Sequence, residues 1–426
     1  MKILRALSDV EAAFHYLHDI GNGSAQVVTA SKVNGSFDSA TVAARLASWA
    51  VRHEVLNVTV HTVHKDTDQE ELQLIGQPFL PEQLIILHED QWFDHQAFFC
   101  KEINTPLPRG MLWRLSVIFI NGALHLYLTR SHVISDAFST RELLQSLLEI
   151  LLWNVSTAQP STLIPGRVGQ PLKRLKAATV PLAIYNREAT IPALRHCTLS
   201  PITERQTRIH RRTLDRTLTA SIIAVCKARG ITLNECFAAA FAEAYCSCLG
   251  TGQVELYTAI NSRRHFGDAL ATGLGCNIHV LGCGLQVVPV PLDSQALRYR
   301  KALSQAGIGW APSPLRHHAL KSKVLRLCVA EHFLGPCITN SGINDFTSAV
   351  YRQVDFVETA VNRNIANYSV VLHLSCFRGR LHVLYSYATP AMSDAIVKQI
   401  DYQLMTRLGL LETSLPGPHP LLSVAR

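Results

Sequence analysis

The sequence predicts a mixed α/β protein that is built from two similar lobes. The chain has 426 residues, and 48% of them are hydrophobic, which is enough for two or three domains or for two large lobes. Two stretches with similar sequences, Gly122–Leu128 and Gly379–Tyr385, lie 257 residues apart, and each precedes a predicted helix. Duplication of one topology in the two halves of the chain would produce this repeat.

The first half alternates between helical and extended patterns. Ser8 and Glu11 have the spacing of a capping box, which predicts that a helix begins there. Asn121-Gly122 separates two β-rich runs, and this dipeptide favours the tight turn of a two-residue hairpin. The predicted helices are Ser8–His18, Ser36–His53 and Thr140–Trp153, and the predicted strands are Val55–Val63, Trp113–Ile120 and Ala123–Arg130.

A change of composition divides the chain after this half. The stretch from Asn154 to Arg212 contains six prolines and little periodicity, so we interpret it as a crossover between the lobes. The predicted organisation is a first lobe at 1–155, a crossover at 156–212 and a second lobe at 213–426. The second lobe is predicted to hold helices Thr217–Arg229, Leu233–Leu249 and Ser393–Leu408, strand Val254–Asn261, a glycine-containing loop Cys337–Asn344 and a hairpin Tyr368–Tyr387 that turns at Arg378-Gly379.

Composition excludes several classes of protein. No run of about 18 apolar residues exists, so no membrane span is expected, and the N-terminus lacks a signal-peptide pattern, which predicts a cytoplasmic location. The net charge of +8 accompanies no recognisable nucleic-acid module and suits an acidic partner or a phosphate-bearing ligand. Basic clusters lie in or near the crossover at Lys173, Arg174 and Lys176, and at Arg205, Arg208, Arg211 and Arg212; each is either a contact for such a partner or solvated surface. Eleven cysteines without a C-x-x-C pair predict buried thiols, no disulfide framework and no metal site.

One histidine has the context of a reactive group. Three His-x-x-x-Asp pairs occur: His15 with Asp19, His64 with Asp68, and His132 with Asp136. We interpret the first two, which lie in a helix and in a charged loop, as surface residues. His132 follows a predicted buried strand and precedes a helix, where rigid elements can present a side chain to a cleft. Its imidazole can accept a proton near neutral pH, although the pattern also allows a purely structural histidine.

The segment from Ser131 to Ala137 resembles the H-H-x-x-x-D-G signature of the superfamily that includes chloramphenicol acetyltransferase, condensation domains of nonribosomal peptide synthetases and plant BAHD acyltransferases. Further landmarks follow in the order of that superfamily and look most like its stand-alone, polyketide-associated Pap-type members. These landmarks are Leu7-Ser8-Asp9-Val10-Glu11, Arg52-His53-Glu54-Val55-Leu56, Ile260-Asn261-Ser262-Arg263 and Thr339-Asn340-Ser341-Gly342. The match spans nearly the whole chain.

Two positions depart from the signature. Ser131 stands where the first histidine of the motif is found, and Ala137 stands in place of its glycine. The first position varies among ester-forming members, so Ser131 leans the prediction away from peptide-forming condensation domains. The D-F-G-W-G stretch of BAHD enzymes is absent, which disfavours that branch.

The resemblance implies a pseudo-dimer of two chloramphenicol-acetyltransferase-like lobes, each a mixed sheet with flanking helices, that meet at a tunnel. It implies that His132 is the general base of a direct acyl transfer and that Asp136 is structural and paired with Arg263, with Arg264 as the fallback. Oxyanion or tunnel contacts would come from Ser131, Thr339, Asn340 or Ser341, of which the last three are equally compatible with packing or a turn.

The same resemblance implies a pantetheine thioester, on coenzyme A or on an acyl carrier protein, as the donor, and no bound cofactor or metal. The predicted function is ester formation on a hydroxyl of a polyketide, lipid-like or other secondary-metabolite acceptor by a monomeric acyltransferase. The alternatives are an amide-forming condensation enzyme of the nonribosomal peptide type and a catalytically silent module that recruits a carrier protein.

Overall fold

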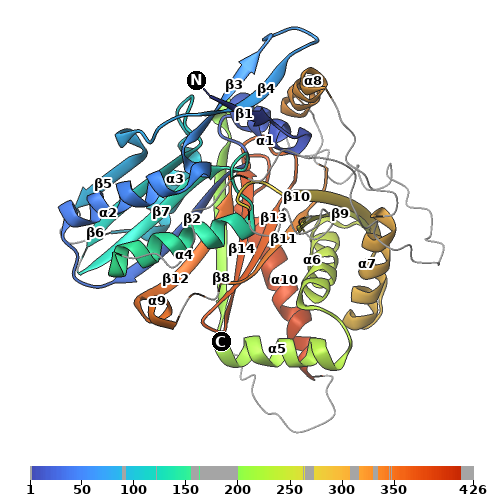
Figure 1. The fold of residues 1–426 in the computed structure, drawn as a ribbon. Coiled ribbons are helices and arrows are strands. Elements are labelled where there is room, and N and C mark those ends of the chain that lie inside the picture. Colours follow the sequence, from blue (N-terminus) through green and yellow to red (C-terminus); the bar gives the residue numbers. More distant parts are fainter. Residues whose placement is uncertain are drawn as a thin grey trace.

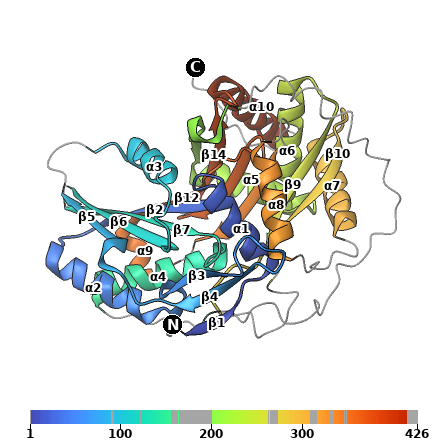
Figure 2. The same cartoon turned by 90° about the horizontal axis from the view of Figure 1, so that it is seen from above.

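A computed structural model describes residues 2–88, 93–120, 122–154, 163, 200–261, 263, 273–307, 316–329, 334–344, 346 and 348–413. These residues form two lobes that lie side by side, each with a central mixed sheet (Figures 1 and 2). The predicted class, a two-lobed α/β protein, is therefore confirmed.

The first lobe is built on a five-stranded sheet in the order β12-β2-β7-β6-β5. Its strands are β2 (Gln26–Asn34), β5 (Leu84–His88), β6 (Trp113–Ile120), β7 (Ala123–Ser131) and β12 (Val354–Val361). Helices α2 (Ser39–Arg52) and α4 (Ala137–Trp153) pack on one face, and α3 (His95–Asn104) packs on the other. The alternation along β7 explains this division, because Leu126 and Leu128 join the core under α4 whereas Tyr127 joins the core under α3.

A small antiparallel sheet and two helices lie at the end of the first lobe where the chain begins. Strands β1 (Ile3–Ala6), β4 (Glu71–Gly76) and β3 (Val58–Val63) form this sheet. Helix α1 (Asp9–Ile20) packs against α8 (His317–Cys328), which comes from the second half of the chain (Figure 2). The predicted capping box at Ser8 and Glu11 is confirmed.

The second lobe is built on a six-stranded sheet in the order β10-β9-β11-β13-β14-β8. Its strands are β8 (Gln206–Leu214), β9 (Gln253–Asn261), β10 (Ile278–Gln286), β11 (Cys337–Ile343), β13 (Val371–Phe377) and β14 (Arg380–Thr389). Helices α5 (Arg216–Ala228), α6 (Leu233–Leu249), α7 (Leu292–Ala306) and α10 (Asp394–Thr413) cover one face and enclose a large apolar core. The other face is turned toward the first lobe (Figure 1).

Strand β12 joins the two lobes. It follows α9 (Ser348–Gln353) in the second half of the chain but pairs antiparallel with β2 of the first sheet. A separate apolar cluster fills the junction beside it, and its members come from both lobes: Val28, Ala30, Phe99, Ile103, Ile118, Tyr127, Ile209, Ala360 and Leu384. The lobes are therefore connected by backbone hydrogen bonds as well as by apolar packing.

Three expectations about boundaries are corrected by the fold. The predicted loop Cys337–Asn344 is strand β11, whose hydrogen bonds to β9 and β13 outweigh its glycine and polar side chains. The predicted crossover 156–212 ends inside β8, which begins at Gln206 as the edge strand of the second sheet. The predicted second lobe, 213–426, includes β12, which belongs to the first sheet. Most of the crossover, Lys173, Arg174 and Lys176 included, lies outside the described residues.

Ten cysteines lie in the described part of the chain, and all ten are free thiols, six of them buried. Among the described residues, no helix combines the length and the apolar character that a membrane crossing requires.

The approach of Gly335 to β9 predicts a sensitive position. A Cβ at residue 335 would lie 2.3 Å from the carbonyl oxygen of Glu255, and its φ of +125° is unfavourable for any other residue. We expect Gly335→Ala to lower the free energy of unfolding by about 2–4 kcal/mol, measured by urea denaturation. Gly122→Ala is the matched control, because Gly122 has a φ of +72° but no atom within 4 Å of the added Cβ; its expected cost is about 1 kcal/mol. Equal losses in the two variants would contradict the steric explanation.

Candidate active site

His132 lies in a tight turn that links β7 to α4. Strand β7 ends at Ser131, and Asp136 caps the N-terminus of α4 by accepting a hydrogen bond from the Ser139 amide. The Ser131 hydroxyl accepts from the Val133 amide at 3.1 Å and closes the turn from inside. The turn is thus fixed at both ends by the strand and by the helix cap.

The imidazole of His132 has one ring nitrogen engaged and one left open. Nδ1 lies 2.9 Å from the carbonyl oxygen of Ser135, which can only accept, so the neutral ring carries its proton on Nδ1. Nε2 has no hydrogen-bond partner among the described residues, so its lone pair is available. The Phe14 ring packs against the imidazole, with 4.6 Å between the centroids. Burial lowers the pKa of His132 to about 4, so the ring is neutral at physiological pH.

Asp136 does not touch the imidazole but organises its surroundings. One carboxylate oxygen accepts from the Ser139 amide, and the other lies 3.1 Å from the Asn277 amide and 2.9 Å from Nη2 of Arg263. Both side chains of the ion pair are buried. The structure therefore brings together Asp136 and Arg263, whereas Arg264 lies outside the described residues.

Arg263 reaches Asp136 from the other lobe, beyond the end of β9. Its guanidinium also donates to the carbonyl oxygens of Gly273 and Gly275, at 2.6 and 3.1 Å, and to the Ser139 hydroxyl. It also lies over the Phe138 ring, 4.5 Å from the centroid. These bonds satisfy a buried charge that would otherwise be costly, and they tie the second lobe to the start of α4.

A second buried arginine, Arg130, also bonds to the turn. Arg130 in β7 donates from Nε to the Ser135 hydroxyl and from Nη1 to the Thr29 hydroxyl, both at 2.9 Å. Burial lowers the pKa of Arg130 to about 9. Because Ser135 also supplies the carbonyl that accepts from His132, Arg130 helps to hold the ring.

The strand β11 carries Thr339, Asn340 and Ser341, the predicted oxyanion or tunnel contacts. The Ser341 hydroxyl donates to the carbonyl oxygen of Leu374 at 3.1 Å, so its proton is already used. Asn340 is exposed, and its Oδ1 accepts from the backbone amide of Gly342. Within the described residues, no hydrogen bond connects these three side chains to His132.

Two functional candidates escaped the sequence analysis, His373 and Arg363. Thr339 pairs with His373 across β11 and β13, and His373 lies 2.8 Å from the Ser386 hydroxyl through Nε2. Burial, together with the charges of Arg363 and His132, lowers the pKa of His373 to about 3. Both groups therefore lie near His132. The alternation of polar and apolar residues along the predicted hairpin Tyr368–Tyr387 could have pointed to His373. No sequence pattern pointed to Arg363.

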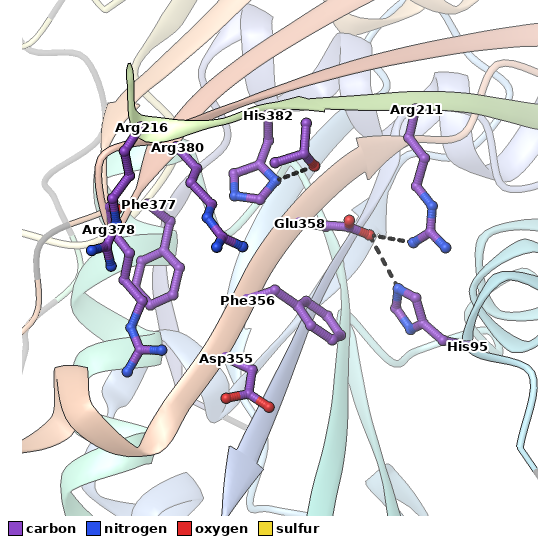
Figure 3. A pocket seen from close by; sticks show the side chains of 11 residues that line it. His95, Arg211, Arg216, Asp355, Phe356, Glu358, Phe377, Arg378, Arg380 and His382 are labelled. Carbon is purple, nitrogen blue, oxygen red and sulfur yellow. Dashed lines mark hydrogen bonds and ion pairs between the residues drawn. The ribbon is translucent and has the colours of Figure 1, made fainter. Parts of the chain in front are cut away.

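A pocket of about 500 Å³ opens beside the first residues of β12, from Asp355 to Glu358. Several arginines line it (Figure 3). Glu358 pairs there with His95 at 3.1 Å and with Arg211 at 3.0 Å. The predicted basic cluster near the crossover is mostly engaged internally, since Arg212 pairs with Asp401 and Arg205 donates to the Ile365 carbonyl oxygen. The pocket includes none of the predicted site residues.

Comparison with known proteins relates the whole fold to a group of enzymes. No protein-family model and no curated protein sequence matches the chain. Solved structures do match, among them a trichothecene 15-O-acetyltransferase from Fusarium sporotrichioides, with a TM-score of 0.68 and 13% identity over 96% of this chain and 95% of that one. The first condensation domain of the CDA synthetase matches with a TM-score of 0.64 and 13% identity over 96% and 97%. The condensation domain of the Monacolin K polyketide synthase matches with a TM-score of 0.62 and 14% identity, over 97% of this chain and 99% of that one. These likenesses show that the chain has the two-lobed fold of condensation domains and chloramphenicol-acetyltransferase-like enzymes.

The buried pair of Asp136 and Arg263 predicts a strong effect on stability. We expect Asp136→Asn and Arg263→Met each to lower the free energy of unfolding by about 3–5 kcal/mol, because each leaves an uncompensated buried charge. The double variant should lose less than the sum of the two single losses, measured by urea denaturation. Glu142→Gln is the control, since it removes half of an exposed pair with Arg141 and should cost less than about 1 kcal/mol. Additive losses in the double variant would show that the two charges are not coupled.

Proposed function

We propose that the chain is an acyltransferase that moves an acyl group from a pantetheine thioester to a hydroxyl group and forms an ester, with His132 as the general base. The observation that carries this proposal is the neutral imidazole of His132, whose Nδ1 is fixed on the Ser135 carbonyl while Nε2 stays open. The shared fold with an acetyltransferase and with condensation domains supports the same class of chemistry.

The reaction needs one proton to move out and back. Nε2 of His132 takes the proton of the acceptor hydroxyl as its oxygen attacks the thioester carbonyl. The tetrahedral intermediate collapses, the carbon–sulfur bond breaks, and the thiolate receives the same proton from Nε2. The protonated ring is held meanwhile by its Nδ1–H bond to the Ser135 carbonyl oxygen, whose dipole favours the positive charge.

The developing oxyanion requires a hydrogen-bond donor. Thr339 is the best of the predicted candidates, because it pairs with His373, whose pKa the charge of His132 affects, and therefore lies on the same face of the sheet. Asn340 pairs with Leu374 of the core under the helices, and the Ser341 proton is already used. Ser131 is assigned to the turn, where its hydroxyl accepts from a backbone amide. Asp136 and Arg263 act as positioning residues, because their bonds hold the turn and do not reach the reacting atoms.

The proposed donor is acyl coenzyme A or an acyl carrier protein, and the proposed acceptor is a small alcohol that a monomeric enzyme takes up between the lobes at a tunnel. The net charge of +8 supports attraction of either acidic donor. Amide formation by a condensation-type enzyme and carrier-protein recruitment without chemistry are the outcomes that the following experiment separates.

We expect acyl esters to form when the protein is incubated with acetyl or hexanoyl coenzyme A and a panel of primary and secondary alcohols, followed by mass spectrometry. His132→Ala should lower kcat/KM by about 10²–10⁴-fold, because the general base is removed. His64→Asn is the matched control, since His64 heads another His-x-x-x-Asp pair in an exposed turn and should retain wild-type activity.

Equal rates from His132→Ala and the wild type would exclude His132 as the base. Products from amines alone would identify an amide-forming enzyme. Binding of acyl carrier protein without any product would identify the recruiting module.

The lowered pKa of His132 predicts an unusual pH profile. A base with a pKa of about 4 is already neutral at pH 5.5, so kcat/KM should stay nearly constant between about pH 5.5 and 7.5 and should decline as the pH falls toward 4. A base with the ordinary pKa of about 6.5 would lose about tenfold over the same interval. Circular dichroism at each pH verifies that the protein stays folded. A tenfold decline centred near pH 6.5 in folded protein would contradict the assignment.

A further inference from the structure

Arg363 lies close to His132 at the same end of the first sheet. Strand β12 ends at Val361, which pairs with Val27 of β2, and Gln26 of β2 pairs with Ser131 of β7. Arg363 and His132 therefore lie just beyond the ends of two strands that share β2 as their neighbour. Two strand spacings of about 4.8 Å place their backbones about 10 Å apart.

The backbone of Arg363 is held firmly in this place. Its amide donates to the Thr207 hydroxyl at 2.7 Å. The flanking residues bond to the first lobe, since Asn362 donates to the Ile103 carbonyl oxygen and the Ile365 amide donates to the Ser24 hydroxyl. The direction of the side chain is thus set by a segment that is fixed on both lobes.

The guanidinium of Arg363 is buried but incompletely satisfied. The residue is 5% exposed. Nη2 donates to the Asn367 side chain, and the guanidinium lies 5.1 Å from the centroid of the Tyr368 ring. Among the described residues, Nε has no hydrogen-bond partner and no carboxylate pairs with the guanidinium. A buried charge without a counter-ion is costly, so a role beyond packing is expected.

The charge of Arg363 acts on the groups that surround the reacting atoms. It lowers the pKa of His132 and of His373, and it opposes the rise of the Cys337 pKa that burial causes. These effects agree with the strand geometry, because a guanidinium facing away from the site would act weakly on all three groups.

We propose that Arg363 anchors a carboxylate of the substrate, so that one of the two molecules joined at His132 carries a free carboxyl group. This inference rests on the proposed acyl transfer. A carboxylate matches the available Nε edge of the guanidinium and its single positive charge. A phosphate dianion would exceed that charge and leave a negative charge buried. The carboxylate belongs either to the acyl group of the donor or to the hydroxyl-bearing acceptor.

Two matched pairs of substrates distinguish these sources. In the donor arm, succinyl coenzyme A is compared with butyryl coenzyme A on one neutral alcohol. In the acceptor arm, acetyl coenzyme A is given 3-hydroxybutyrate or its methyl ester. We expect kcat/KM to favour the carboxylate member of one pair by about tenfold or more in the wild type.

Variants of Arg363 test whether the side chain causes that preference. In Arg363→Gln the ratio should fall to near one, mainly through a higher KM for the carboxylate member, and Arg363→Lys should restore part of it. Arg216→Gln is the control, since it removes an exposed arginine of the pocket shown in Figure 3 and should keep the wild-type ratio. A ratio near one for the wild type in both arms, or an unchanged ratio in Arg363→Gln, would overturn the proposal.

A binding measurement separates this inference from the proposed function. Succinate and dimethyl succinate are titrated calorimetrically into the wild type and into Arg363→Gln. Succinate binding that Arg363→Gln abolishes, in a protein that acylates no alcohol, would support the anion site and refute the acyl transfer. Esters formed without carboxylate preference or succinate binding would refute the anion site alone. If Arg363→Gln fails to fold by circular dichroism, the wild-type ratios in the two arms decide.

Discussion

The ion pair between Asp136 and Arg263 is the interaction on which the geometry of the candidate site depends. It connects the start of α4 in the first lobe with the segment beyond β9 in the second, and both partners are buried. Several further bonds gather on the same pair, since Ser139 and Gly275 bond to Arg263 and the backbone amide of Asn277 bonds to Asp136. Because one partner of this buried pair comes from each lobe, the position of His132 depends on the contact between the two lobes.

Burial determines the protonation of the histidines at this junction. His132 and His373 both have pKa values well below 6.5, so between about pH 4 and 6.5 the unfolded chain binds protons that the folded chain excludes. Stability therefore rises with pH across that interval and is lost as the pH falls. Arg363 and Arg130 add permanent positive charges nearby, which disfavour any further cation. Burial and these two charges thus keep the imidazole of His132 unprotonated.

The sequence was sufficient for the elements with strong local signals. The capping box at Ser8, the hairpin at Gly122 and the second hairpin at Gly379 follow from side-chain chemistry within a few residues. Strand β11 was missed because its pairing with β9 and β13 is a tertiary property, which its composition contradicts. The contact of Asp136 with Arg263 followed from family resemblance, whereas the role of Arg363 depends on burial and on a missing partner, which no local pattern records.

The insertion of β12 into the first sheet has a consequence for how the protein is made. Thr29 of β2 meets Thr359 of β12, and 330 residues separate them along the chain. During synthesis on the ribosome, β2 is therefore an open sheet edge until most of the polypeptide has emerged, and such edges invite wrong pairing. The first sheet accordingly stays incomplete until β12 arrives, and the open edge of β2 is covered only then. A protein of this design should respond strongly to chaperones and to the speed of translation.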